Sequence, residues 1–275
     1  MLNGTEMRHV TDGNTELTYL YDGTFEGFLC CIYDSYVHKE VPTRIDTEDG
    51  MPMLFEATKW IKTDWNHAQS IYASLAKKIG MEAQEFLRDA FLSNAPNKEI
   101  YMYHYICMGY KLGRKIFDYL TDPTVDYLVK AVKNVNRECQ KYLGFIRFTQ
   151  YGDVMVACIT PKNRVLPRLA PHFENRFPDS SFLIYDKTHK MAVVKRPEGM
   201  VITSMEKLTL PTISDEEQAY RRLWKCFLKN IAIEERTNPK CQMNLMPKRY
   251  WKDMDEDMLS EYKDGDLLRK IEGNA

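Results

Sequence analysis

Several motifs that identify common enzyme classes are absent from this sequence of 275 residues. It contains no GxxxxGKS/T phosphate-binding loop and no GxGxxG dinucleotide fingerprint. It also lacks the GxSxG elbow of α/β-hydrolases, the HExxH helix of zinc proteases and a cysteine cluster for an iron–sulfur centre. The residues therefore predict no cofactor, no metal and no familiar catalytic mechanism.

Long apolar runs and paired cysteines are also missing. No stretch approaches the ~18 apolar residues of a transmembrane helix. The first thirty residues are acidic and carry no basic region followed by an apolar core, so a secretory signal is not indicated. The seven cysteines are scattered without a CxxC pair, which argues against a disulfide framework and a structural zinc site. We expect a cytoplasmic protein without membrane contact.

The net charge of −1 conceals an uneven distribution. Residues 1–60 hold 4 Lys and Arg against 11 Asp and Glu, and residues 253–275 hold 3 against 8. Residues 61–252 therefore hold 31 basic against 20 acidic residues. A basic body of this kind suits a polyanionic partner, although Lys and Arg also serve simply to solvate helix faces.

Hydrophobic periodicity predicts an α+β fold in which helices and strands are segregated. The N-terminal half is predicted to contain a strand at 17–21, a helix at 25–36, a loop at 40–52 and a strand within 53–61. Four helices are predicted to follow, at 65–79, 82–92, 97–112 and 123–142. The next part reads as a hairpin of strands at 145–149 and 154–160, a helix at 166–176, a second hairpin at 182–186 and 191–195, and a connector at 197–214. A capping box, Ser214 with Glu217, starts a closing helix that runs to about 233.

These elements predict a single α+β domain over residues 15–252. Its helical part is 60–142, and its mostly antiparallel β-rich part is 143–196. The closing helix and a basic arm occupy 214–252, and residues 253–275 form an acidic tail.

The basic arm, residues 236–252, is the clearest candidate for a binding segment. Its cations can neutralise phosphates, and its neighbouring rings can stack on bases. Two X-Pro steps predict an extended path for it. Alternatively, the rings anchor the arm to the core while the charges face water, and the two roles can coexist. The candidate nucleic-acid-binding residues are Arg236, Lys240, Lys248, Arg249, Tyr250, Trp251 and Lys252.

A weaker candidate for chemistry lies in the β-rich part. His172 is expected on the short helix, and Asp186 at a strand end three residues before His189, where a metal or a proton could be held. Arg147 is expected in mid-strand, where it could bind a phosphate or form a cross-strand ion pair. A purely structural role for Asp186 and His189 is the more economical interpretation.

Several phrases, taken together in this order, resemble one known family. They are YDGTFEG at 21–27, GFIRF at 144–148, LAPHF at 169–173, RFP at 176–178, IYD at 184–186, NPK at 238–240 and MPKRYW at 246–251. The sequence is similar over 17–252 to bacterial DNA-metabolism or DNA-repair proteins of unknown mechanism. The resemblance implies a DNA context. In that family the domain is also found fused to uracil-DNA glycosylases, and stand-alone members accompany a radical SAM protein.

Three functions follow as hypotheses. The first is a nucleic-acid-binding accessory factor that acts with a radical SAM partner. The second is an enzyme acting on DNA, which requires His172, Asp186 and Arg147 to converge. The third is a protein adaptor without DNA contact, which would need a large exposed apolar patch.

Overall fold

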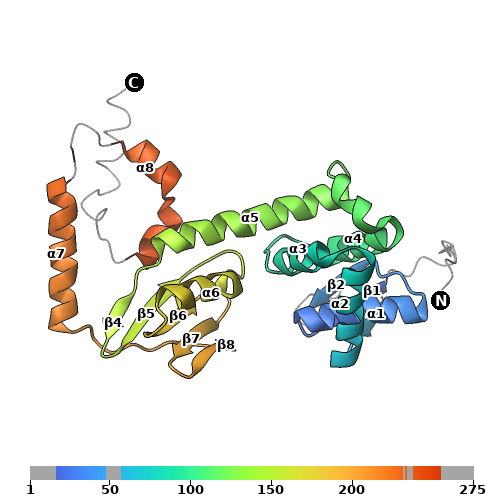
Figure 1. Cartoon of the computed structure of the whole chain (residues 1–275), viewed down its shortest axis with the longest axis horizontal. Helices are drawn as coiled ribbons and strands as arrows, with labels where there is room; N and C mark the ends of the chain where they lie inside the picture. Colours follow the sequence, from blue (N-terminus) through green and yellow to red (C-terminus); the bar gives the residue numbers. More distant parts are fainter. Residues whose placement is uncertain (1–16, 48–56, 232, 234–237, 255–275) are drawn as a thin grey trace. The chain divides into compact units, whose positions relative to one another are not determined.

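A computed structural model describes residues 17–47, 57–231, 233 and 238–254. Its backbone contacts divide the chain into two compact units, residues 1–133 and residues 134–275 (Figure 1). The helix α5, Pro123–Phe145, runs through the boundary between them. Each unit is described by itself, and the expected single domain over 15–252 stays a prediction.

The first unit contains a parallel three-stranded sheet. Strand β1, Leu17–Tyr21, is central, with β2, Arg44–Thr47, on one side and β3, Ala57–Trp60, on the other. Helix α1, Phe25–His38, connects the first two strands, and the Thr24 hydroxyl caps it by accepting the Gly27 N–H. The expected loop at 40–52 was wrong in part, because β2 lies within it. Its polar sequence hid an edge strand that gains its order from backbone pairing with β1.

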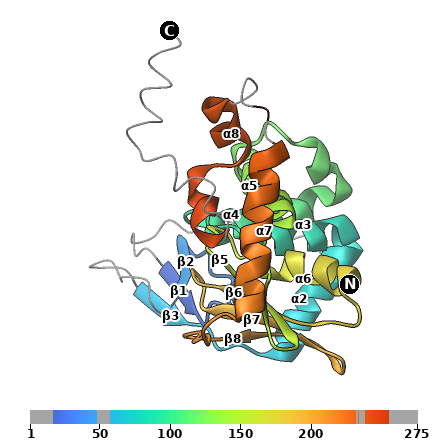
Figure 2. The ribbon, with the colours of Figure 1, turned by 90° about the vertical axis from the view of Figure 1, so that its left-hand side faces the viewer.

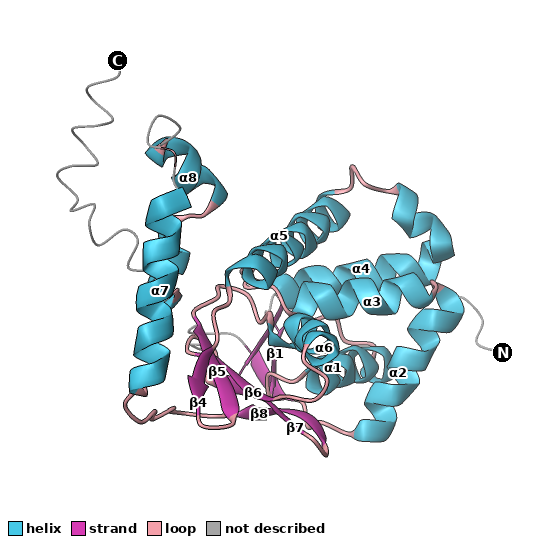
Figure 3. Ribbon diagram, turned by 60° about the vertical axis from the view of Figure 1, so that its left-hand side comes forward, coloured by secondary structure: helices cyan, strands magenta, loops and turns pink. Residues whose placement is uncertain are grey.

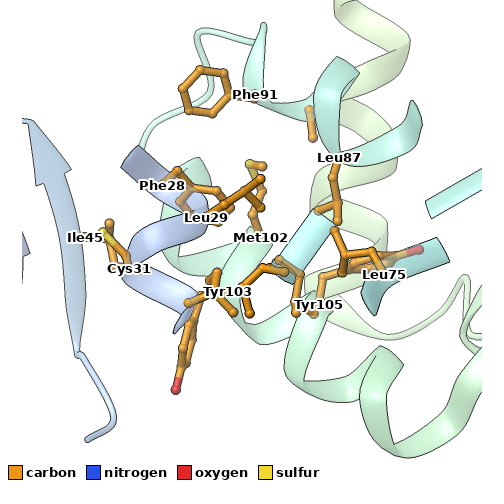
Figure 4. Close-up of a cluster of buried hydrophobic side chains, with 14 of the residues drawn as sticks. Phe28, Leu29, Cys31, Ile45, Leu75, Leu87, Phe91, Met102, Tyr103 and Tyr105 are labelled. Atoms are coloured by element: carbon orange, nitrogen blue, oxygen red, sulfur yellow. The ribbon is translucent and has the colours of Figure 1, made fainter. Parts of the chain in front are cut away.

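The remaining helices of the first unit match the predicted periodicity closely. They are α2 Trp65–Lys78, α3 Met81–Phe91, α4 Lys98–Leu112, the 3₁₀ turn η1 Gly113–Asp118, and the start of α5, whose first turn is capped by Asp122. Their apolar faces meet in one core (Figure 4), where Phe28, Leu75, Leu87 and Met102 are buried. Burial of such side chains stabilises the unit by roughly 2 kcal/mol each.

The second unit contains a five-stranded, mostly antiparallel sheet in the order β4-β5-β6-β7-β8. The strands are β4 Thr149–Tyr151, β5 Val154–Ile159, β6 Ser181–Asp186, β7 Met191–Arg196 and β8 Gly199–Ser204. Strands β5 and β6 are parallel because α6, Leu166–Arg176, crosses between them and covers the sheet near β7 and β8. The predicted hairpin at 182–186 and 191–195 is confirmed. The first is shifted, because its leading strand is β4, Thr149–Tyr151, where 145–149 was expected, and β8 lies where a connector was expected.

Two sequence expectations fail near the ends of this sheet. Helix α5 continues to Phe145, and β4 begins only at Thr149, so Arg147 lies between the two elements and not in a strand. The basic arm is not extended. Asn238 caps a short helix, α8 Pro239–Leu245, and Lys248–Asp253 form the 3₁₀ turn η3. Asn followed by Pro is a regular helix start, with the cap before a first-turn proline, which the extended interpretation overlooked.

The closing helix, α7 Asp215–Ile231, begins as predicted, since the Ser214 hydroxyl accepts the Glu217 N–H. Figure 2 shows α8 beyond the far end of α7. The predicted class is confirmed: helices dominate the N-terminal half, followed by the mostly antiparallel sheet and a C-terminal helix. None of the helices in the described part of the chain combines the length and the apolar character needed to cross a bilayer.

Candidate nucleic-acid interface

The turn η3 is fixed to the second unit by aromatic packing. Tyr250 is buried, with its ring at 5.1 Å from Tyr142 and 5.3 Å from Phe145, both on α5. Burial raises the pKa of both tyrosines. The nearby Glu138 carboxylate adds to the rise at Tyr142, whereas Arg249 opposes it at Tyr250. Trp251 donates its indole N–H to the Met246 carbonyl at 2.9 Å, which closes the segment between α8 and η3. These rings hold the segment in place.

A buried carboxylate on α5 joins η3 to the loop that follows β5. Glu138 is 2% exposed and accepts the backbone N–H groups of Lys162 at 3.0 Å and Asn163 at 2.8 Å. The Asn163 amide donates a further bond at 2.6 Å. Arg249 reaches the same carboxylate at 2.9 Å. Because a buried charge must be paired and hydrogen-bonded, Glu138 fixes the positions of both segments.

A second junction ties η3 to the turn after β6. Lys187 forms an ion pair with Asp253 at 3.0 Å, and the Asp253 side chain is only 4% exposed. The Lys187 N–H also bonds to the Ile159 carbonyl, at the carboxyl end of the neighbouring parallel strand. Ligands of sheets with parallel strands bind outside this carboxyl edge.

The turn itself is organised by Asp186, which is buried at the end of β6. Its carboxylate accepts the N–H groups of Thr188 and His189 and meets the His189 ring nitrogen Nδ1 at 2.6 Å. The carboxylate thus closes the turn and orients the imidazole.

These junctions produce an uneven distribution of charge at the carboxyl edge of β5 and β6. The acids that tie the segments together, Glu138, Asp186 and Asp253, are buried and used internally. The cations on or beside the same segments are exposed. We call this set the basic edge: Arg137, Lys162, Arg164, Lys190 and Lys248, beside Lys187 and Arg249, which pair with Asp253 and Glu138. Charges that face water create the field that an approaching ligand meets, so this edge attracts anions.

The predicted nucleic-acid-binding residues divide into three groups. Lys240 and Lys248 are exposed, on α8 and η3. Arg249 is half-buried against Glu138, Trp251 is partly buried, and Tyr250 is buried, so these three hold the segment in place. Arg236 lies outside the described residues, as does the side chain of Lys252. The anchoring alternative therefore holds for the rings, and the cations remain candidates for contact.

The weaker catalytic candidates occupy different settings. Asp186 pairs with His189, whereas His172 is exposed on α6 with its ring against Phe173. Arg147 lies in the segment between α5 and β4, near the carbonyls of Gly144 and Ile146. Among the described residues, no group of three His, Cys, Asp or Glu side chains forms a cluster that could hold a metal ion.

The residues that organise the basic edge were largely missed from the sequence. One signal was available for Glu138, which lies three residues after Val135 and four before Tyr142 in the buried stripe of α5. An acid inside an apolar stripe indicates a buried ionic partner. Lys162 and Asp253 had no such signal, because their positions follow from the parallel crossover and from the fold of η3.

Comparison with known proteins gives a family and no activity. A family model described as a domain of unknown function (DUF4130) matches residues 96–256. Among solved structures, a pGpG-specific phosphodiesterase, PggH from Vibrio cholerae, is 11% identical with a TM-score of 0.29. That alignment covers 79% of this chain and 99% of the other, and a likeness of this degree carries no inference about function. No curated protein matches the sequence.

Proposed function

The chain belongs to the DUF4130 family, and we propose that it is a nucleic-acid-binding accessory protein of DNA metabolism that contacts phosphates through the basic edge. The observation that carries the proposal is the separation of charge at this edge. Three acids are buried, while the cations around them face water on α5, the loop after β5, the turn after β6, and η3.

Backbone contact is the recognition that this surface suits. Lysine and arginine neutralise phosphates without regard to sequence, and each contact releases condensed counterions. Stacking by Tyr250 does not contribute, because its ring lies between α5 residues. We therefore expect binding that weakens steeply with salt and discriminates little among sequences.

The test is fluorescence anisotropy with single-stranded and duplex DNA and with RNA. The informative variant combines Lys162→Ala, Arg164→Ala and Lys248→Ala, because these side chains are exposed and Lys162 meets Glu138 through its backbone N–H. Lys248 lies over the Trp251 ring at 5.9 Å, so tryptophan fluorescence checks that η3 keeps its place in the variant. Arg249 and Trp251 are unsuitable, since replacing either one disturbs the packing of η3. The matched control removes three exposed lysines of the first unit: Lys77→Ala, Lys111→Ala and Lys115→Ala.

We expect the basic-edge variant to bind at least about tenfold more weakly at low salt, because each lost phosphate contact removes part of a dominant electrostatic term. The control variant should bind like the wild-type protein. Equal loss in both variants, or no binding to any nucleic acid by the folded wild-type chain at low salt, would refute the proposal.

The radical SAM partner implied by the family resemblance stays a prediction. Its contribution is testable by adding that partner to the anisotropy assay. Catalysis by His172, Asp186 and Arg147 is not part of the proposal, since the oriented imidazole at the strand end is that of His189.

A further inference from the structure

The turn between β6 and β7 carries an imidazole whose proton position is fixed by its neighbour. The two strands lie side by side in the sheet (Figure 3), and Asp186 ends the first of them. Its Oδ1 accepts the backbone N–H groups of Thr188 and His189, and its Oδ2 lies 2.6 Å from Nδ1 of the His189 ring. Because an ionised carboxylate can only accept hydrogen bonds, Nδ1 carries a proton. The neutral ring therefore presents Nε2 as an acceptor.

The second ring nitrogen of His189 can be reached from outside. The His189 side chain is 16% exposed, whereas the Asp186 side chain is 1% exposed. Among the described residues, Nε2 has no hydrogen-bond partner, and it is not one of the enclosed polar atoms that lack a partner. Solvent therefore reaches Nε2. A fixed and accessible acceptor of this kind is available to a ligand.

Exposed cations flank this imidazole on the same turn. Lys187 and Lys190 are both exposed, and the ion pair of Lys187 with Asp253 places the turn beside η3. Lys190 has a φ of 54°, which is uncommon for a residue with a side chain, and its carbonyl accepts the Met205 N–H at 2.8 Å. Such a backbone persists only where its surroundings determine it. The turn thus holds the ring in a set position at the basic edge.

An acceptor among phosphate-binding cations selects one kind of group on a nucleic acid. Phosphate oxygens only accept hydrogen bonds, so a phosphate on the lysines offers nothing to a neutral Nε2. The ribose 2′-hydroxyl is a donor, lies on the sugar next to the phosphate, and is the group by which a protein distinguishes RNA from DNA. Donors on the bases lie farther from the backbone, and pairing uses them in a duplex. The 2′-hydroxyl is therefore the group that suits Nε2.

We propose that His189 is a specificity-determining residue of the basic edge, and that its Nε2 accepts a hydrogen bond from a ribose 2′-hydroxyl. The edge then prefers RNA to DNA. Asp186 is a positioning residue, because it acts through the ring. The contact rests on the proposed function, since the cations of the edge must first hold the phosphates. A hydrogen bond of this kind changes affinity by about three- to tenfold.

Fluorescence anisotropy at pH 8, where free imidazole is neutral, tests the proposal. It compares three single strands of one sequence: RNA, DNA and 2′-fluoro RNA. The 2′-fluoro sugar keeps an electronegative atom at the same position but has no hydrogen to donate. The wild-type protein should bind RNA about three- to tenfold more tightly than either of the other strands.

Two variants separate the hydrogen bond from other effects of the ring. His189→Ala should bind the three strands equally. In Asp186→Asn, the amide oxygen can still accept the N–H groups of the turn, while the amide nitrogen donates to Nδ1 and moves the ring proton to Nε2. The preference for RNA should then disappear although the ring remains. His104→Ala, which removes an exposed imidazole on α4, should keep it. Circular dichroism checks that each variant is folded.

The possible failures can be told apart. Equal affinity of the wild type for RNA and 2′-fluoro RNA would overturn this contact and leave the proposed function standing. A preference for RNA that survives in His189→Ala or Asp186→Asn would also overturn it. Equal weakening of all three strands in His189→Ala would make the ring one more phosphate contact, contrary to the proposal. Failure of the folded wild type to bind any strand would refute the proposed function, and this contact with it.

Discussion

The two units of this protein use charge in opposite ways. Residues 1–133 hold 14 basic and 19 acidic residues, whereas residues 134–275 hold 24 and 20. The larger difference lies in which charges are buried. The second unit buries Glu138, Asp186 and Asp253 beneath exposed cations. In the first unit Arg114 pairs with Glu82 at the surface, and the more enclosed Glu99 lies beside Lys98 on the same helix.

This comparison shows that the sign of the charge on a surface depends on which charged side chains are buried, as well as on the amino-acid composition. A sum over the sequence counts Glu138 and Lys162 as equal and opposite charges. In the fold, Glu138 is neutralised inside by Arg249 and backbone donors, while the Lys162 ammonium faces water. The second unit is therefore more positive at the basic edge than its sequence sum indicates.

The largest expected effect comes from removing the buried acid of the second unit. Glu138→Ala deprives three N–H donors and Arg249 of their acceptor, so we expect a loss of about 3 kcal/mol in the free energy of unfolding. Urea unfolding measures it, and a red shift of tryptophan fluorescence should report release of η3. Asp126→Ala is the control, because its exposed pair with Lys130 contributes less than about 0.5 kcal/mol. Equal effects of the two changes would contradict the structural role of Glu138.

Two glycine-to-alanine substitutions, one in each unit, should change the stability of the protein in opposite directions. A Cβ at Gly27 would lie 2.2 Å from Asp22 Oδ1 and 2.8 Å from Thr63 Oγ1, so Gly27→Ala should destabilise the first unit by about 2 kcal/mol. At Gly144, in α5, nothing lies within 4 Å, and Gly144→Ala should stabilise by about 0.5–1 kcal/mol. Thermal unfolding of both variants measures these shifts, and a neutral Gly27→Ala would show that the Asp22 carboxylate can move.

The smallest effect concerns a carboxyl group of the first unit. Burial raises the pKa of Glu99, opposed by Lys98 and by the hydroxyl of Tyr21. A raised carboxyl pKa favours folding at acid pH. The protonated carboxyl contributes its full stabilisation below the ordinary carboxyl pKa near 4.3. That stabilisation is lost as the pH rises through the raised pKa of the folded state. Glu99→Gln should therefore raise the unfolding free energy at pH 7 and flatten its pH dependence. Parallel pH profiles for the wild type and the variant would contradict this.

Most elements followed from local pattern, and the failures have physical causes. The stripe and caps of α5 depend only on neighbouring residues, so its start at Pro123 was predictable. Strand β2 and strand β8 were missed because they take their order from pairing with a neighbour. Strand β2 is polar, and β8 carries three apolar residues in succession, so neither sequence alternates strictly between apolar and polar residues. Helix α8 was missed although its Asn238 cap and Pro239 were visible.

The candidate site was predictable only in part. The cations of the basic arm were visible from composition, but the burial of Tyr250 depends on Tyr142 and Phe145, about a hundred residues earlier. The convergence of Lys162, Lys187 and Arg249 depends on the parallel crossover from β5 to β6 and on three buried acids. Contacts of this range are set by tertiary structure and leave no local pattern.

The most direct test of the basic edge is the salt dependence of nucleic-acid affinity in the wild type and the two triple variants. The logarithm of affinity should fall linearly with the logarithm of salt concentration. Lys162→Ala with Arg164→Ala and Lys248→Ala should reduce that slope by about 2.7, since each of the three lost phosphate contacts on duplex DNA removes about 0.9. The first-unit control should keep the wild-type slope. Three equal slopes, or a reduction confined to the first-unit variant, would contradict the account.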